Sequence, residues 1–394
     1  MLEQTLTFIL AGGQGKRLHP LTAATAKPLL PFGAGFRILD FTLSNCNNSG
    51  LQQTYLLTQF DAESVQEYVA SGWKGAVCLR SPEGNSYRGT ADAILHHRNL
   101  IRSASPEFVL ILCADHIYKM DYRKLLDFHI RTGGDVTVAA IEYPIALANQ
   151  FGVIATDDRD RIVAFDEKPS VARPMPSKPD KALVSMGIYL FNTKALLREG
   201  PRCPITRGFD FGKDVIPEMI RSHRVSAYNH TMSGSGLGVY WRDVGALDTY
   251  YRSQMDLLSR ESPFDPYNSA DWPIHTASRR ATFHSTSRNG CVTDSVIADD
   301  CNTQGARVTR SVIGSQTCLG PGAEVQDSVI MAGVRIGRSA QLRRAIVQEG
   351  AEIPDNACIG FGLKDDCRQN LVSQEGIVVV DSERCRDRCR SAIA

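Results

Sequence analysis

The chain has 394 residues, of which 43% are hydrophobic and 22% charged, and its net charge at pH 7 is +1. This length exceeds the size at which one hydrophobic core usually stops growing, so we expect two domains. No long basic block accompanies the near-neutral charge, which argues against a nucleic-acid partner. No apolar run approaches the roughly 18 residues of a membrane span, so no membrane partner is expected.

Eleven cysteines are scattered along the chain and form no Cys-x-x-Cys pair. Residues 6–10 are apolar, but they are too few for a signal peptide and lack its basic flank. Without a secretory signal, we interpret the cysteines as reduced thiols rather than as disulfides or a metal site, and we expect a cytoplasmic protein.

Short apolar runs alternate with amphipathic stretches over the first 250 residues. The expected strands are residues 5–10, 53–58, 108–113, 135–141, 152–155 and 183–191. The expected helices are residues 61–69, 91–101 and 122–131. This alternation predicts an α/β fold for residues 1–250, with a Rossmann-like, mostly parallel sheet. Ligands of such sheets bind at the carboxyl ends of the strands, so the loop after the first strand is the first place to seek chemistry.

The C-terminal part repeats itself. Similar triplets recur at residues 295–297, 311–313, 328–330 and 345–347, and apolar residues between them fall six apart. Six-residue spacing with small residues at the corners is typical of a parallel β-helix, and a β-sandwich is the alternative. We therefore expect a helix and linker over residues 251–288 and a β-helix over residues 289–394. The open ends of a β-helix favour cover by another domain or subunit.

A glycine-rich turn follows the first expected strand. Gly12, Gly13 and Gly15 lead into Lys16 and Arg17. Glycines let backbone N–H groups approach an anion closely, and the positive N-terminal end of a following helix adds to this. The spacing matches neither a P-loop nor a dinucleotide fingerprint, and a plain tight turn is the alternative.

A lysine follows ten residues beyond this turn. Lys27 precedes Pro28. A lysine at such a constrained position predicts a phosphate ligand that reaches back to the turn.

These motifs resemble a known family. The pattern Gly-Gly-x-Gly-x-Arg-Leu followed by Lys-Pro is similar to the signature of nucleoside-diphosphate-sugar pyrophosphorylases. More specifically, seven further blocks resemble the glucose-1-phosphate adenylyltransferase family: residues 36–46, 87–93, 115–118, 167–169, 185–189, 240–245 and 373–378. The resemblance covers nearly the whole chain and implies a left-handed β-helix as the C-terminal domain.

The resemblance implies an activity. The family transfers the adenylyl group of ATP to α-D-glucose 1-phosphate and forms ADP-glucose and pyrophosphate, for the synthesis of glycogen or another α-glucan. The sugar phosphate attacks the α-phosphorus in line, so catalysis is mostly positioning and charge stabilisation. The implied catalytic residues are Arg17 at the departing pyrophosphate, Lys27 at the phosphates, and Asp115.

The resemblance also implies binding residues and a metal. The implied ATP ligands are Gly12, Gly13, Gly15, Gln59 and Gly89. The implied glucose 1-phosphate ligands are Tyr87, Gly152, Glu167, Lys168 and Ser185. Two carboxylates, Asp115 and Asp243, would repel phosphates unless a cation lay between them, and Mg²⁺ is the expected cofactor. Asn45, His116 and Arg242 are expected to support the site.

The sequence and the resemblance also lead to expectations on regulation and assembly. Residues 21–26 lack the basic side chains that strongly activated members of the family carry, so we expect weak or different activation by fructose 1,6-bisphosphate. Arg37, Arg343 and Arg344 remain as candidates for an anionic effector site. The adjacent Arg343 and Arg344, on a turn of the β-helix, have an alternative interpretation as a solvated surface pair. The family implies a homotetramer.

Three other functions compete with this one. A sister pyrophosphorylase would use another nucleoside triphosphate or sugar phosphate. A fused acyltransferase would need a histidine on the β-helix, and no histidine follows Arg288. A non-catalytic regulatory subunit is expected to lose charged site residues, whereas this chain retains those named above.

Overall fold

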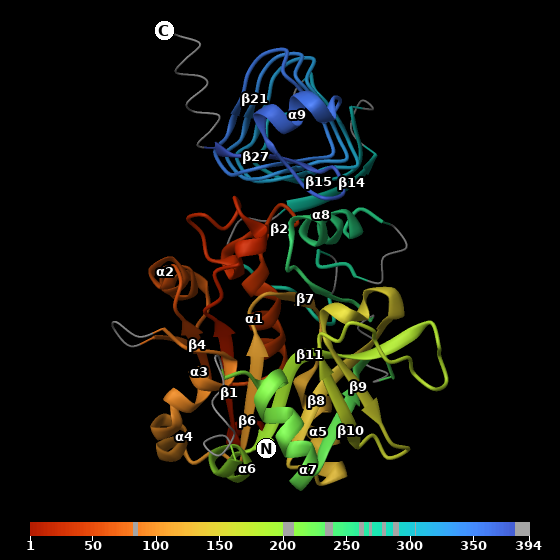
Figure 1. The fold of residues 1–394 in the computed structure, drawn as a ribbon. Coiled ribbons are helices and arrows are strands. Elements are labelled where there is room, and N and C mark those ends of the chain that lie inside the picture. Colours follow the sequence, from red (N-terminus) through yellow and green to blue (C-terminus); the bar gives the residue numbers. More distant parts are fainter. Residues whose placement is uncertain are drawn as a thin grey trace. The chain divides into compact units, whose positions relative to one another are not determined.

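The computed structural model describes residues 1–81, 86–199, 209–232, 239–259, 264–267, 270–277, 281–286, 291–303 and 305–382 (Figure 1). Its internal contacts define two compact units. The sheet unit comprises Met1–Gly13, Thr42–Ala114 and Lys119–Trp241. The β-helix unit comprises Gln14–Phe41, Asp115–Tyr118 and Arg242–Ala394. Both units draw on the first 250 residues, and the linear boundaries at residues 250 and 288 stay a prediction.

The sheet unit contains a nine-stranded sheet with a parallel core. β1 (Thr5–Ala11) pairs in parallel with β4 (Thr54–Thr58) and with β6 (Phe108–Cys113), and β4 pairs in parallel with β5 (Ala76–Arg80). Six of the seven β1 residues are buried, as expected for a strand covered on both faces. The parallel core and the strand predicted at residues 108–113 are confirmed.

The other side of the sheet is antiparallel. β11 (Lys181–Asn192) runs antiparallel to β6, to β8 (Val136–Pro144) and to β9 (Gly152–Thr156). β10 (Ile162–Glu167) extends β9, and β12 (Val225–Asn229) pairs in parallel with β8. The prediction missed β5, β10 and β12. β5 has no buried residue and β10 only two, so neither shows a strong apolar pattern.

The helices of this unit follow the predicted segments with one difference. α2 (Ala62–Gly72) and α5 (Tyr122–Thr132) are single helices, and α5 begins where the Asp121 carboxylate accepts a bond from the Arg123 N–H. The segment predicted at residues 91–101 forms two helices, α3 (Thr90–His96) and α4 (Arg98–Ala104). Further helices are α6 (Thr193–Glu199) and α7 (Ile216–Ser222). None of the helices among the described residues is long and apolar enough to cross a bilayer.

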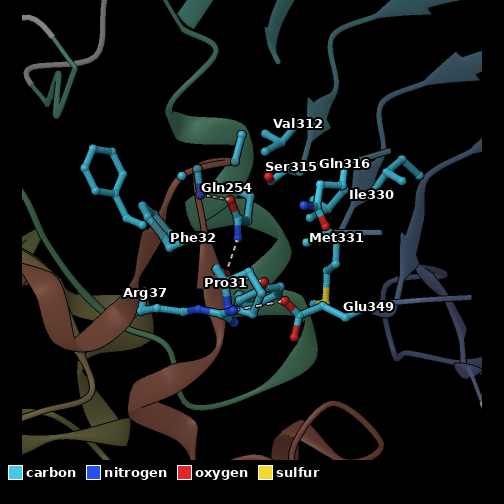
Figure 2. Close-up of a pocket in the computed structure, with 18 residues that line it drawn as sticks. Pro31, Phe32, Arg37, Gln254, Val312, Ser315, Gln316, Ile330, Met331 and Glu349 are labelled. Carbon is cyan, nitrogen blue, oxygen red and sulfur yellow. Dashed lines mark hydrogen bonds and ion pairs between the residues drawn. The ribbon is translucent and has the colours of Figure 1, made fainter. Parts of the chain in front are cut away.

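The N-terminal segment of the β-helix unit is short and tightly bonded. A 3₁₀ helix over Lys27–Leu29 leads into a hairpin of β2 (Pro31–Phe32) and β3 (Phe36–Arg37), after which α1 (Ile38–Ser49) begins. The helix α8 (Leu247–Asp256) holds this hairpin through Gln254, which donates to Pro31 O at 3.0 Å and accepts from Gly33 N at 2.8 Å (Figure 2).

The C-terminal part is a left-handed parallel β-helix, and its register matches the predicted repeat. Val296 pairs with Val312, Val312 with Val329, and Val329 with Ile346. The corresponding strands are β15 (Val292–Ala298), β17 (Val312–Ile313), β20 (Val329–Ile330) and β23 (Ala345–Val347). The other sides of the coils are β16 (Arg307–Thr309), β18 (Cys318–Leu319), β19 (Glu324–Gln326), β21 (Arg335–Ile336), β22 (Gln341–Arg343), β24 (Glu352–Ile353) and β25 (Cys358–Ile359). The apolar residues spaced six apart form one buried core.

A buried serine ladder connects successive coils at one corner. Ser311 N donates to Ser295 Oγ, Ser328 N to Ser311 Oγ and Ala345 N to Ser328 Oγ, each at 3.1 Å. The residue before each of these four positions has a positive φ, between 45° and 50°. The serines therefore satisfy buried backbone donors at a sharp corner, which explains why three of the four triplets begin with serine.

Both ends of the β-helix carry extra strands. β14 (Ala281–Thr286), within the predicted linker, pairs antiparallel with β15. At the other end, α9 (Leu363–Gln369) leads to β26 (Leu371–Val372) and β27 (Val378–Val380), and β27 continues the β23 side of the coil (Figure 1).

Ser311→Ala is expected to destabilise the β-helix by about 1–3 kcal/mol, because the buried Ser328 N–H loses its acceptor. Hydrogen exchange over residues 325–347, together with thermal unfolding, measures the effect. Ser103→Ala, the same change at an exposed serine of α4, is the control. Equal protection in the two variants would contradict the role of the ladder.

Candidate active site

The glycine-rich turn requires glycine at one position for two reasons. Gly15 has a φ of 61°, and a Cβ on it would lie 3.0 Å from Thr22 Cγ2 and 3.2 Å from Lys27 Cβ. Thr22 Oγ1 donates to the Gly15 carbonyl at 2.9 Å. A side chain at this position would separate the turn from Lys27. In the sheet unit, Gly12 packs closely on Gln59, since a Cβ on Gly12 would lie 3.3 Å from Gln59 Cβ.

Lys27 lies between two carboxylates. Its Nζ is 2.7 Å from Asp115 Oδ2 and 3.3 Å from Asp243 Oδ1, and its side chain is 8% exposed. Burial disfavours the ammonium, but the two carboxylates outweigh this and raise the pKa of Lys27 above its usual value. Burial alone would raise the pKa of Asp115, yet Lys27 and His116 hold it well below its usual range. Lys27 and Asp115 are therefore both charged at neutral pH.

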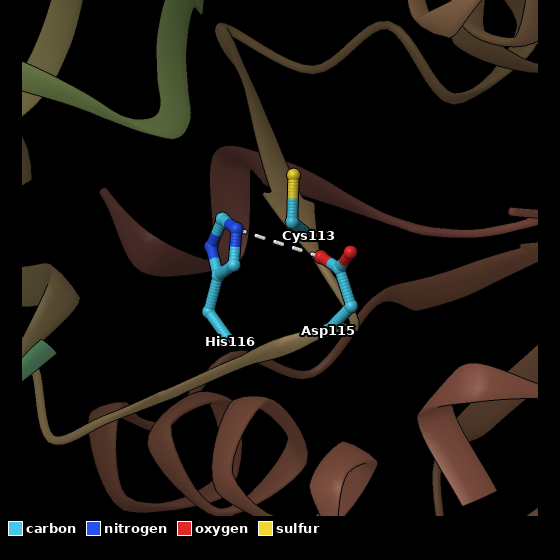
Figure 3. A group of neighbouring side chains, drawn as sticks. All are labelled: Cys113, Asp115 and His116. Carbon is cyan, nitrogen blue, oxygen red and sulfur yellow. Dashed lines mark ion pairs between the residues drawn. The ribbon is translucent and has the colours of Figure 1, made fainter. Parts of the chain in front are cut away.

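Two short strands bring the carboxylates together. Asp115 comes directly before β7 (His116–Tyr118), which pairs with β13 (Trp241–Asp243), the strand that ends in Asp243. His116 Nε2 lies 3.5 Å from Asp115 Oδ1 and 4.0 Å from Asp243 Oδ1 (Figure 3 draws the first pair). The histidine ring thus lies close to both carboxylates, and its supporting role stays a prediction. Nearby in sequence, Cys113 donates its thiol hydrogen to Gly187 O.

Arg17 belongs to the same group. A Cβ on Gly245 would lie 2.9 Å from Arg17 Nη2 and 3.1 Å from Asp243 Oδ2. Gly245 therefore leaves room for the guanidinium next to the Asp243 carboxylate. Arg17, Lys27, Asp115 and Asp243, predicted from four separate motifs, lie together in one unit.

The donor set fits a magnesium ion. Asp115 and Asp243 both direct a carboxylate oxygen at a single cationic centre, the Lys27 ammonium. Mg²⁺ is a hard cation that proteins bind through one or two carboxylates together with phosphate oxygens. The two aspartates would hold the ion, which would supply charge neutralisation and orientation of the phosphates.

A second cluster lies in the sheet unit around Glu167. A Cβ would lie 3.0 Å from Glu167 Oε2 if placed on Gly152 and 2.8 Å if placed on Gly212. Lys168 Nζ is 3.7 Å from Glu167 Oε1 and its side chain is 59% exposed, so the ammonium is open to an anionic ligand. Ser185 lies on β11 and accepts from Gly187 N at 3.2 Å. The structure thus brings Gly152 and Lys168 to Glu167.

The remaining predicted ligands form a third group in the sheet unit. Gln59 Oε1 accepts from Tyr87 N at 2.9 Å, and the Tyr87 hydroxyl is 2.9 Å from His97 Nε2. A Cβ on Gly89 would overlap the backbone of Phe209, so glycine is required there. Tyr87 is therefore joined to Gln59, whereas its hydroxyl faces a histidine and not the Glu167 cluster.

Sequence reasoning missed two contributors. Gly212 approaches Glu167 as closely as Gly152 does, and Asp210 bonds both N and Oγ1 of Thr90, beside Gly89. Neither residue lies near a recognised motif in sequence. Of the other expected supporting residues, Asn45 accepts from Met120 N, and Arg242 pairs with Asp256.

The three arginines considered for an effector contact different partners. Arg37 pairs with Glu349 at 3.2 Å. Arg343 lies over the Phe361 ring, 4.6 Å from its centroid, and Arg344 donates to Glu375 O at 2.9 Å.

Comparison with known proteins identifies the class. Residues 6–260 match the nucleotidyl transferase family model, and residues 277–380 match the GlmU-like C-terminal hexapeptide model. The chain therefore belongs to the nucleotidyl transferase family.

Individual relatives narrow this assignment. The chain is 41% identical to the glucose-1-phosphate adenylyltransferase of Methylococcus capsulatus, over 96% of this chain and 94% of the relative. The enzyme of the same name from Paramagnetospirillum magneticum is 43% identical over 80% of this chain and 78% of the relative, and that from Nitrosococcus oceani is 38% identical over 99% and 96%. The resemblance to glucose-1-phosphate adenylyltransferases is confirmed.

Lys27→Met is expected to lower the free energy of unfolding by about 2 kcal/mol, because it leaves two carboxylates without their counter-ion. The expected loss is below that of a fully buried pair, since the aspartate side chains are 34% and 25% exposed. Denaturant titration measures it, with the exposed Lys16→Met as the control. Adding Asp115→Asn to Lys27→Met is expected to recover part of the stability, and a further loss would contradict the electrostatic explanation.

Proposed function

We propose that the chain transfers the adenylyl group of ATP to α-D-glucose 1-phosphate, forming ADP-glucose and pyrophosphate for glycogen or α-glucan synthesis. The observation that carries the proposal is the convergence of Lys27, Asp115 and Asp243 beside the glycine-rich turn, in a chain whose relatives bear the name of this activity. A phosphate oxygen of the sugar attacks the α-phosphorus, and the bond to the bridging oxygen of the leaving pyrophosphate breaks.

The glycine-rich turn and the charged residues have different roles at the phosphates. The turn from Gly12 to Gly15 offers backbone N–H groups to the triphosphate. Arg17 neutralises charge on the departing pyrophosphate, and Lys27 orients the phosphates near the reacting phosphorus. Asp115 and Asp243 would hold Mg²⁺, which would supply further positive charge at the phosphates.

The Glu167 cluster serves the sugar phosphate. Glu167 accepts hydrogen bonds from glucose hydroxyls, and the exposed Lys168 ammonium pairs with the phosphate. Gly152 and Gly212 leave space around the Glu167 carboxylate, in which side chains would otherwise lie.

The assignment extends to assembly, compartment and regulation. We propose a cytoplasmic homotetramer whose activation by fructose 1,6-bisphosphate is weak or different. Light scattering coupled to size exclusion measures the assembly, and initial rates with fructose 1,6-bisphosphate measure the response to the effector. The sister reaction with another nucleoside triphosphate is the alternative, and rates with all four triphosphates distinguish the two.

Pyrophosphate release is expected with ATP and glucose 1-phosphate and is expected to stop when EDTA removes divalent cations. Asp115→Asn is expected to lower kcat at least about 100-fold, because it removes a charge at the reacting phosphates. Asp158→Asn, at an exposed site, is the control. Undiminished turnover of Asp115→Asn would remove this residue from the mechanism, and an inactive wild type would favour a regulatory subunit.

Glu167→Gln is expected to raise the KM for glucose 1-phosphate about tenfold, the cost of one weakened hydrogen bond to a charged group. The KM for ATP is expected to change little. The neighbouring Asp166→Asn is the control, because Asp166 is 46% exposed and pairs with Arg173. An equal rise in both KM values would argue against a sugar-specific role.

A further inference from the structure

The β-helix unit contains a cavity of about 210 Å³ that none of the proposed catalytic residues lines. Its walls are the β2–β3 hairpin, α8 and three successive coils of the β-helix (Figure 2). Among the described residues that line it, Arg37 carries the one positive charge and Glu349 the one negative charge. The rest of the lining is apolar or neutral, so these two charges determine the electrostatics of the cavity.

Arg37 joins two parts of the chain. Its Nη2 is 3.2 Å from Glu349 Oε1, and its Nη1 donates to Leu29 O at 2.8 Å. The backbone of Arg37 is fixed separately, because its N–H donates to Asp40 Oδ2 at 2.8 Å. The guanidinium is therefore held between a carboxylate of the β-helix and a backbone carbonyl of the N-terminal segment.

The carbonyl that Arg37 binds belongs to the helix of Lys27. Leu29 ends the 3₁₀ helix Lys27–Leu29, and a carbonyl at the end of such a helix has no partner within it. Leu29 N donates to Ala26 O, and Leu30 N donates to Lys27 O. A guanidinium on Leu29 O therefore fixes the last turn of the segment that presents Lys27 to Asp115 and Asp243.

Backbone hydrogen bonds fix the turn that carries Glu349. It lies in the turn between β23 and β24, where Gln348 N donates to Val380 O and Gly350 N donates to Ala332 O. Coils on both sides thus hold the backbone of this turn. The side chains of Arg37 and Glu349 are 26% and 35% exposed, so water screens their attraction only in part.

We propose that Glu349 is a positioning residue: through Arg37 and the Leu29 carbonyl, it holds the segment that carries Lys27. The β-helix then contributes to catalysis by orienting the catalytic lysine without touching substrate. The proposal rests on the proposed function for its kinetic consequence alone, because the contacts themselves are independent of the reaction.

The test compares Glu349→Ala with Glu352→Ala, which removes an exposed glutamate from the neighbouring strand β24. Hydrogen exchange is measured over residues 27–38, with residues 54–58 of β4 as the internal reference. Glu349→Ala is expected to raise exchange in residues 27–38 only, and Glu352→Ala is expected to leave both segments unchanged. Equal exchange in the two variants would overturn the proposal.

Kinetics supply the second measurement. Glu349→Ala is expected to lower kcat about tenfold to a hundredfold, since misplacement of a catalytic group has effects of this size. The KM for glucose 1-phosphate is expected to be unchanged. Acetate is expected to restore part of kcat in Glu349→Ala but not to change Glu352→Ala, because a small carboxylate fits the enlarged cavity and can pair with Arg37.

The exchange and kinetic measurements together distinguish a failure of the positioning role from a failure of the proposed function. A wild type that releases no pyrophosphate from any triphosphate would refute the proposed function, and the exchange measurement would still decide whether Glu349 holds the Lys27 segment. Wild-type kcat in Glu349→Ala, in an active preparation, would overturn the positioning role.

Discussion

The burial of one ammonium group constrains the architecture of the candidate site. Lys27 is 8% exposed, and a buried charge is tolerated only when partners compensate for the lost water. Its two partners come from segments far apart in sequence, Asp115 before β7 and Asp243 at the end of β13. The pairing of β7 with β13 therefore has a role in the site, because it brings together the two carboxylates that the lysine requires.

The same requirement explains why a β-helix accompanies the charged group. The hairpin after Lys27 is bonded to α8 through Gln254, and Tyr251 of α8 donates to Asp327 O of the β-helix at 2.6 Å. Because α8 begins four residues after Asp243, this one helix is connected both to the strand that ends in Asp243 and to the hairpin that follows Lys27. A regular coil with a buried serine ladder is a stiff base for such contacts, and positions of this kind determine how well catalytic groups are oriented.

Structural features could be predicted where the sequence repeats or where the residues that form them are neighbours along the chain. The β-helix register could be read from residues 295 to 347, because each coil pairs only with its neighbours and a fixed period determines the pairing. Buried strands such as β6 were equally clear from their continuous apolar run. β5, which has no buried residue, and the break that divides residues 91–101 into two helices have no such signal in the sequence. Gly212 and Glu349 were missed for the same reason, since each acts on a residue more than 40 positions away and has no motif of its own.

The free-energy cost of burying the charged groups around Lys27 favours an enzyme over a non-catalytic scaffold. A well-packed apolar substitute for a buried ion pair is often as stable as the pair or more stable. A chain that needed only its fold would therefore gain nothing from Lys27 between two aspartates, with Arg17 beside them at Gly245. The group instead gathers two carboxylates, Asp115 and Asp243, and two cationic side chains, Lys27 and Arg17, at one place. A site that handles a metal-bound triphosphate uses both kinds of charge, carboxylates for the metal and cations for the phosphates, so the arrangement is understandable in a catalyst and has no use in a passive subunit.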